Sequence, residues 1–248
     1  MKSNWKWAIM FAAAVAFVGC KEKNQPTPTP TPEPEPEKEY VNPISVTDGS
    51  AADWEKLPAE FVVSSVCPED AEMLGLKSVK VYADEVYINI LVEFDPEVVV
   101  DQAWVPFHVY LNTDNSDETG GFGDQFLDAN TDILLEGAIL ADGAHKSYSP
   151  GVHAWAGEVG GDGWHWTEIA AEDASTFSQS QGFGNFFEIQ MLRELIPAPA
   201  DAPWNADEFG IGFDIQQNWS SVGILPIGVA SEENPKGLAH KLQIKINK

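Results

Sequence analysis

Apolar and polar residues alternate along most of the chain from residue 41 onward, as in strands with one buried face. The stretch 77–94 keeps this alternation on both sides of the polar segment Ala83-Asp84-Glu85 and predicts a β-hairpin. In 240–246 the alternation predicts that the leucine and isoleucine side chains point inward and that Lys241 points outward. Similar patterns predict strands at 105–111, 132–140, 152–158, 163–169, 186–192 and 209–215.

No segment keeps a helical period of 3.6 residues beyond two turns. Short strands separated by clusters of Gly, Pro, Asn and Asp favour two packed sheets. The sequence therefore predicts an all-β fold, an antiparallel two-sheet β-sandwich that residues 41–248 form as one domain.

The first 19 residues resemble a lipoprotein signal peptide. Lys2 and Lys6 precede a short apolar run at 7–18, which is too brief to span a bilayer, since that needs roughly 20 apolar residues. The run ends in Phe17-Val18-Gly19-Cys20, which resembles the lipobox of bacterial lipoproteins. The resemblance implies cleavage before Cys20 and acylation of that residue, and more than one acyl chain gives stable anchoring. An ordinary cleaved secretory signal is the alternative.

Residues 20–40 form a predicted tether. Proline occupies every second position from Pro26 to Pro36, which prevents helix and sheet ladders and favours an extended polyproline conformation. Such a tract is a semi-rigid spacer that holds a folded head away from a membrane. We therefore expect a lipid-anchored protein of a Gram-negative outer membrane, facing either the cell surface or the periplasm.

Composition narrows the possible partners. The chain has 39 Asp and Glu residues against 14 Lys and Arg residues, for a formal charge of −25, and its only arginine is Arg193. A strongly negative surface repels phosphate backbones, so the composition excludes nucleic acid and argues against charge-driven contact with anionic lipid. Neutral sugars, small ligands and cations are the partners that remain.

Several motifs follow one another in the order of a known family. The domain opens with Asp48-Gly49 and Asp53-Trp54, continues with the hairpin 79–90 and the loop and strand 109–137, and closes with strands at 187–189 and 209–215. This series resembles the family 9-like carbohydrate-binding modules, whose fold is a DOMON-like β-sandwich, over nearly all of 44–248. The resemblance implies sugar binding without catalysis and a core position for Trp54.

The loop 112–132 is rich in oxygen ligands and glycine. Calcium prefers six to eight hard oxygens on a backbone that turns sharply, so the loop predicts a structural Ca²⁺ site, although it is not an EF-hand. A solvated connection whose side chains cap turns is the alternative. The predicted ligands are Asp114, Asp117, Asp124, Asp128 and Asp132.

A second candidate site lies in 153–166, where a glycine-rich turn separates two segments with three tryptophans. An exposed indole is a flat platform for the apolar face of a sugar ring. Trp164 and Trp166 are two residues apart and are expected on one strand face, with His165 opposite; the side of Trp155 depends on register. We predict carbohydrate contacts from Trp155, Trp164, Trp166 and His165, with a core role as the alternative.

These features predict a non-catalytic glycan-binding lipoprotein that acts beside outer-membrane glycan-uptake proteins. A structural subunit of an envelope complex is the main alternative. A haem-binding DOMON-type domain is a further one, with Met73 or Met191 and a histidine as ligands, but no spacing selects a pair. A glycosidase role is the last, and neither a Ser-His-Asp arrangement nor an H-E-x-x-H motif is present to support catalysis.

Overall fold

The computed structural model describes residues 40–99, 103–170 and 177–248. Every secondary-structure element given below belongs to the unit Asn42–Lys248. The predicted signal peptide 1–19, Cys20 and the tether up to residue 39 lie outside the described residues. Within the described ranges, no helix has the length and apolar character needed to cross a membrane.

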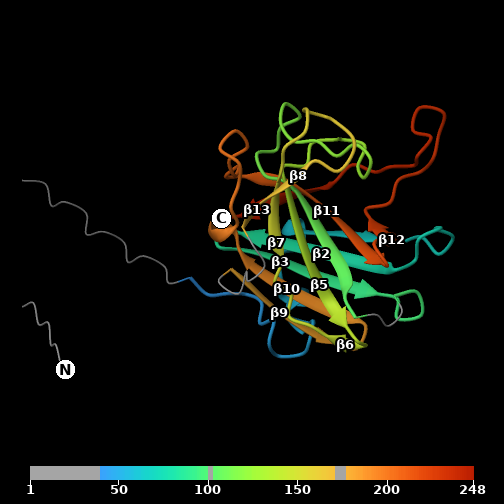
Figure 1. Ribbon diagram of the computed structural model, residues 1–248. Helices are drawn as coiled ribbons and strands as arrows, with labels where there is room; N and C mark the ends of the chain where they lie inside the picture. Colours follow the sequence, from blue (N-terminus) through green and yellow to red (C-terminus); the bar gives the residue numbers. More distant parts are fainter. Residues whose placement is uncertain (1–39, 100–102, 171–176) are drawn as a thin grey trace, which may run out of the picture. The chain divides into compact units, whose positions relative to one another are not determined.

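The described residues form strands and short 3-10 turns, without an α-helix, so the all-β prediction is confirmed (Figure 1). The strands are β1 (Val62–Val66), β2 (Leu76–Asp84), β3 (Tyr87–Phe94), β4 (Val105–Asn112), β5 (Ile133–Ala141), β6 (Ala144–His145), β7 (Gly151–Trp155), β8 (Trp166–Ala170), β9 (Ser178–Phe183), β10 (Phe186–Leu192), β11 (Glu208–Gln217), β12 (Ser220–Leu225) and β13 (Leu242–Asn247). The 3-10 turns are η1 (Ala52–Lys56), η2 (Ala59–Phe61) and η4 (Arg193–Leu195).

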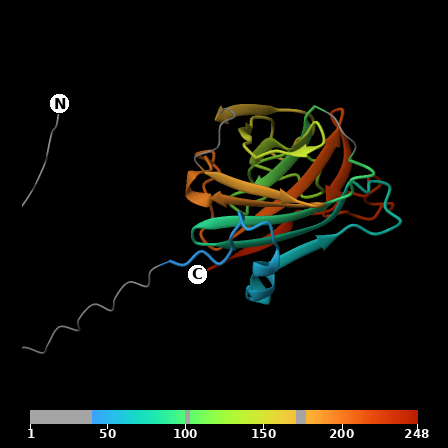
Figure 2. The ribbon, with the colours of Figure 1, turned by 90° about the horizontal axis from the view of Figure 1, so that it is seen from below.

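Ten of the thirteen strands in the described residues follow one continuous hydrogen-bonded path, in the order β8-β7-β5-β4-β11-β13-β2-β3-β10-β9. The other three pair beside it, β1 with β2, β12 with β11 and β6 with β5. The sheet curls, as Figures 1 and 2 show. The last strand, β13, joins its two halves by pairing antiparallel with β11 and parallel with β2, at Ile246↔Ala83 and Asn247↔Asp84. The sheet is therefore mixed, which differs from the purely antiparallel pairing that the sequence predicts, because alternation in a strand does not reveal the direction of its neighbour.

The main core lies inside the curl. Alternate residues of β4 and β11 point into it, as do those of β2, β3, β5, β10 and β13. On β4 these are Val105, Phe107, Val109 and Leu111, and on β11 they are Phe209, Ile211, Phe213 and Ile215. Because side chains alternate along a strand, the remaining residues of both strands lie on the outer side of the sheet.

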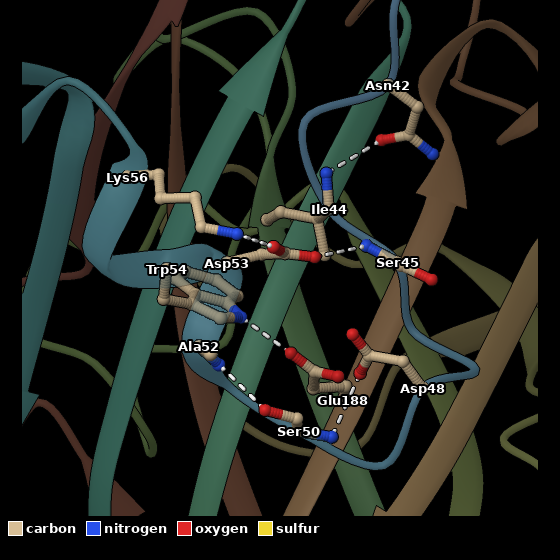
Figure 3. Close-up of polar contacts among 10 residues, drawn as sticks. All are labelled: Asn42, Ile44, Ser45, Asp48, Ser50, Ala52, Asp53, Trp54, Lys56 and Glu188. Carbon is tan, nitrogen blue, oxygen red and sulfur yellow. Dashed lines mark hydrogen bonds and ion pairs between the residues drawn. The ribbon is translucent and has the colours of Figure 1, made fainter.

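The outer side of β2, β3 and β10, here called the N-terminal face, lies under residues 42–61. Trp54 on η1 is 5% exposed and packs beside Ile44, Tyr82 and Leu91. Its Nε1–H donates a 2.7 Å hydrogen bond to Oε1 of Glu188 on β10 (Figure 3). The core position expected for Trp54 is confirmed.

Several strand predictions need correction. Strands β7 and β8 are shorter than 152–158 and 163–169, because the glycine-rich segment between Trp155 and Trp166 forms a loop. The alternation does not reveal strands β1, β6, β9 and β12, which carry few large apolar residues in period. Lys241 lies on the outer side of the sheet, beside Phe126, but it does not reach solvent: its side chain is 1% exposed and pairs with Asp128.

Candidate functional site

The outer side of β5, β4 and β11 carries a row of ionisable side chains. His108 lies opposite Glu136 on β5 and opposite Asp214 on β11 in the strand registers. All three side chains project away from the main core, since their strand neighbours fill it. We call Glu136, His108 and Asp214 the polar row, and this side of the sheet the polar-row face.

The polar row is closely connected. Nε2 of His108 lies 3.2 Å from Oε2 of Glu136, and Nδ1 of His108 lies 3.2 Å from the hydroxyl of Tyr110. Oδ2 of Asp214 accepts hydrogen bonds from Nε2 of Gln216 at 2.6 Å and from the hydroxyl of Ser221 at 3.0 Å. Because His108 and Asp214 are each 1% exposed and the Glu136 side chain is 21% exposed, the row reaches solvent at Glu136.

Burial and charge separate the two carboxyl groups of the row. Burial raises the pKa of Asp214 from 3.8 to about 6, against the opposing effect of its Gln216 hydrogen bond. The hydrogen bond and charge of His108 hold the pKa of Glu136 below its usual value. Near neutral pH Glu136 is therefore an anionic acceptor at the solvent edge, while Asp214 is the more readily protonated buried partner.

An aromatic cluster covers the neighbouring part of this face. Tyr110 and Leu134 project from the sheet, and Phe122 and Phe126 of the loop 113–132 pack on them. The ring of Phe126 lies over Gly212, where any side chain would collide with it. The loop is thus held by contacts that only glycine permits at position 212 of the sheet.

The three tryptophans of the predicted carbohydrate site meet at this cluster, but their environments differ. Trp155 packs against Gly121 and Gly157, and its Nε1–H donates to the Glu158 carbonyl at 2.9 Å. Trp166 is partly buried, with its ring centroid 5.2 Å from that of Trp155. Both indoles are therefore largely occupied by the protein itself.

Trp164 is the most accessible of the three. It is 56% exposed, and its ring centroid lies 6.4 Å from that of His108 and 6.0 Å from that of Phe122. It lies two residues before Trp166, the first residue of β8, and its ring stands beside His108 of the polar row. His165 is also exposed and makes an edge contact with Trp155, at 5.7 Å between ring centroids.

Two of the predicted calcium ligands bind lysines. Oδ1 of Asp124 lies 3.0 Å from Nζ of Lys236, and its Oδ2 accepts from the Gly163 amide at 2.7 Å. Asp128 pairs with the buried Lys241, and Nζ of that lysine lies 5.1 Å from the Phe126 ring centroid. These two aspartates secure the loop to the β7–β8 turn and to the segment before β13.

The charge of Asp114 acts on the Asp132 carboxyl group, while Asp117 is exposed. The Thr119 hydroxyl donates to Asp114, and the Thr113 amide donates to Oδ2 of Asp132 at 2.7 Å. Oδ1 of Asp132 is buried without a hydrogen-bond partner, and burial followed by the nearby Asp114 raises its pKa to about 6. Asp132 also borders a cavity of about 100 Å³ that Glu118 and Asp201 help to line. Across the described ranges, no three His, Cys, Asp or Glu side chains form a metal-binding group.

The polar row is not among the sites that the sequence predicts. The strand carries a partial signal, because Pro106, His108 and Tyr110 alternate with the apolar residues Val105, Phe107, Val109 and Leu111. What was missing is register, because 28 residues separate His108 from Glu136 and 106 separate it from Asp214. Adjacent strands bring them together only in the folded sheet.

Two of the residues considered as haem ligands, Met191 and His108, are surrounded by other groups of the protein. Met191 is fully buried in the main core, and both ring nitrogens of His108 face polar groups of the protein.

Comparison with known proteins adds no relative: no family model matches the chain, and no curated protein matches its sequence.

Proposed function

We propose that this protein binds a neutral glycan on the polar-row face without cleaving it. The observation that carries the proposal is the exposed Trp164 indole, whose ring centroid lies 6.4 Å from that of His108 in the polar row. A sugar ring has apolar C–H faces and hydroxyls around its edge, so it needs a flat aromatic surface next to hydrogen-bonding groups. The charge of −25 favours neutral over anionic sugars.

Each part of this face has a role in the proposed complex. Trp164 stacks on the sugar ring, and the solvent-facing Glu136 accepts hydrogen bonds from its hydroxyls. His108 holds Glu136 in place. Phe122 contacts the Trp164 indole and is itself packed against Trp155 and Trp166. His165 supplies a further polar group at the rim of the site.

We further propose the membrane anchor, the tether and the partners that the sequence predicts. Acylation of Cys20 anchors the protein to the outer membrane, the tether 20–40 extends from it, and glycan-uptake proteins are its partners. The curled sheet is a β-sandwich of the family 9-like carbohydrate-binding type. Mass spectrometry of protein extracted from membranes tests the anchor, since the acylated Cys20 peptide has a defined mass.

The proposed protein also binds Ca²⁺, through fewer of the five aspartates than the sequence predicts. Asp114 and Asp132 are the supported ligands, because Oδ1 of Asp132 is buried without a hydrogen-bond partner. Hard oxygens in a turning loop are the ligands that Ca²⁺ prefers. Asp124 and Asp128 are occupied by Lys236 and Lys241 and are not expected to take part.

Isothermal titration with a panel of soluble neutral oligosaccharides tests the function. We expect heat of binding with at least one of them, and a loss of affinity of about tenfold or more in Trp164→Ala, because an aromatic anchor contributes on the order of 2 kcal/mol. Leu195→Ala is the matched control, since it removes an exposed apolar side chain elsewhere. Absence of heat with every sugar, in the presence of calcium, would contradict the proposal.

A further inference from the structure

Trp219 occupies a backbone conformation that a large side chain rarely adopts. A two-residue turn, Asn218-Trp219, joins β11 to β12, whose flanking residues Gln217 and Ser220 pair directly. Both turn residues have positive φ, 51° and 62°. Such turns favour Asn at the first position and Gly at the second, because a Cβ in the left-handed region is strained. Trp at the second position therefore costs conformational free energy.

Burial does not compensate for this strain. Trp219 is 65% exposed, one of the most exposed large apolar side chains in the described part of the chain. Its ring centroid lies 5.3 Å from that of Trp104, and the two ring planes are tilted by 41°. A strained residue whose side chain is directed into solvent points to a role outside folding.

The two indoles border a hollow. Its volume is about 250 Å³, and Ala103, Pro106 and Asn218 complete its lining. Small-molecule pockets begin at roughly 300 Å³, so this hollow suits a single ring rather than a whole oligosaccharide. The lining has no charged side chain and offers two indole surfaces beside one amide. This is the chemistry of a sugar-stacking position.

The hollow lies on the same strand as the polar row. Pro106 shares its side of β4 with His108, and Trp104 directly precedes the strand. Four residues of strand span about 13 Å, so Trp104 lies at roughly that distance from His108, on the side away from Tyr110. Trp164 contacts His108 itself and Phe122, whose ring stacks on Tyr110 on the opposite side of His108 from Trp104. The polar row thus lies between two aromatic positions, a separation that several linked sugar rings span.

We propose that Trp104 and Trp219 form a second aromatic subsite for the same neutral glycan. The ligand is then an extended chain that stacks on Trp164 at one end, crosses the polar row and stacks on Trp219 at the other. This inference rests on the proposed function, which it deepens by naming the ligand as an internal stretch of oligosaccharide rather than a single terminal sugar.

The test is a titration series with increasing oligosaccharide length, using a sugar that the wild-type protein binds. Affinity is expected to rise with length until both subsites are occupied. Trp219→Gly is the informative variant, because glycine is the preferred residue at this turn position and the hairpin is retained. We expect its melting temperature to equal or exceed that of the wild type. Its affinity for short chains should be unchanged, and its affinity for long chains should fall about tenfold.

The outcomes separate the two proposals. Trp164→Ala is expected to weaken binding at every length, whereas Trp219→Gly affects long chains alone. If the wild type binds sugar but length has no effect, or if Trp219→Gly binds long chains normally, the second subsite is wrong and the proposed function stands. A large drop in the melting temperature of Trp219→Gly would show that Trp219 serves the fold and would also overturn the subsite. If no chain of any length binds, both proposals fail.

Discussion

The N-terminal face and the polar-row face are two regions on the outer side of one curled sheet. Each combines tryptophan with a buried carboxyl group. On the N-terminal face the Trp54 indole lies inside the protein and donates to Glu188. On the polar-row face Trp164 stands in solvent beside Glu136 and its neighbours. The same residue types therefore form a closed contact on one face and an accessible surface on the other.

The difference comes from what covers each face. Residues 42–61 lie on the N-terminal face, where Trp54 and Leu57 fill the space over Tyr82 and Leu91. On the polar-row face the loop 113–132 covers Tyr110 and Leu134 but leaves Glu136 partly exposed. A tryptophan becomes core or binding surface according to the segment packed over it, because the indole suits both environments.

Trp54→Ala should give the largest effect, since it tests whether the N-terminal face is structural. Removing a buried tryptophan costs about 3–5 kcal/mol of unfolding free energy, and it leaves Glu188 without its donor. Trp164→Ala, by contrast, should change stability by less than about 0.5 kcal/mol, as for an exposed position. Urea denaturation of both variants measures this. Equal losses in the two would erase the distinction between the faces.

The pH dependence of Glu188 sharpens the comparison. Burial, with Asp48 and Asp53 nearby, raises its pKa from 4.5 to about 7, and its Oε2 is buried without a hydrogen-bond partner. The folded state therefore favours the protonated form. Its stabilising contribution is complete below about pH 4.5 and is lost as the pH rises through about 7. Glu188→Gln should therefore lose less stability than the wild type as the pH rises from about 4.5 to about 7.

Thermal melts across that range measure the effect of Glu188→Gln. Glu60→Gln, an exposed change on η2, is the matched control and should follow the wild type. Asp132 and Asp214, whose pKa values are raised to about 6, contribute a loss of the same sign at lower pH. These two losses are common to the variant and the wild type, so the variant should diverge from the wild type mainly between about pH 4.5 and about pH 7. Parallel curves for Glu188→Gln and the wild type would refute the assignment.

Calcium should give the smallest effect, because it acts on the loop beside the polar-row face alone. A ligand that binds only the folded state raises the melting temperature in proportion to the logarithm of its concentration. We expect millimolar Ca²⁺ to raise the wild-type melting temperature by about 2–4 °C relative to chelator, which corresponds to about 1 kcal/mol. Asp132→Asn should lose this response, while Asp124→Asn should keep it. Identical melts with calcium and chelator would remove calcium from the proposal.

Local sequence patterns reveal some parts of this protein and miss others. The hairpin of β2 and β3, the strands β4, β10 and β11 and the core position of Trp54 all follow from short-range alternation or motif. Strand β9 is mostly polar and β12 is short, and both are recognisable only from their pairing with β10 and β11. Lys241 reads as an outward residue, yet Asp128, which lies 113 residues earlier, makes its burial possible.

The candidate site divides in the same way. The hairpin with Trp155, Trp164 and Trp166 is visible in the sequence, but only packing shows that Gly121 and Gly157 fix Trp155 while Trp164 is left exposed. The sequence offers five aspartates as equal metal ligands. In the fold, the lysines at 236 and 241 occupy two of them. Register across β5, β4 and β11 creates the polar row, and no local pattern shows that its three members meet.

The sequence by itself determined that the chain forms strands, where most of them lie and which partners its negative charge disfavours. These properties depend on near neighbours and on total charge, which a linear pattern contains. The tertiary structure alone decided which side chains meet across strands, which tryptophan is exposed and which carboxyl groups are desolvated. These depend on contacts between residues far apart in the sequence, such as His108 and Asp214, which are 106 positions apart. Strand register brings such residues together, and alternation alone does not determine register.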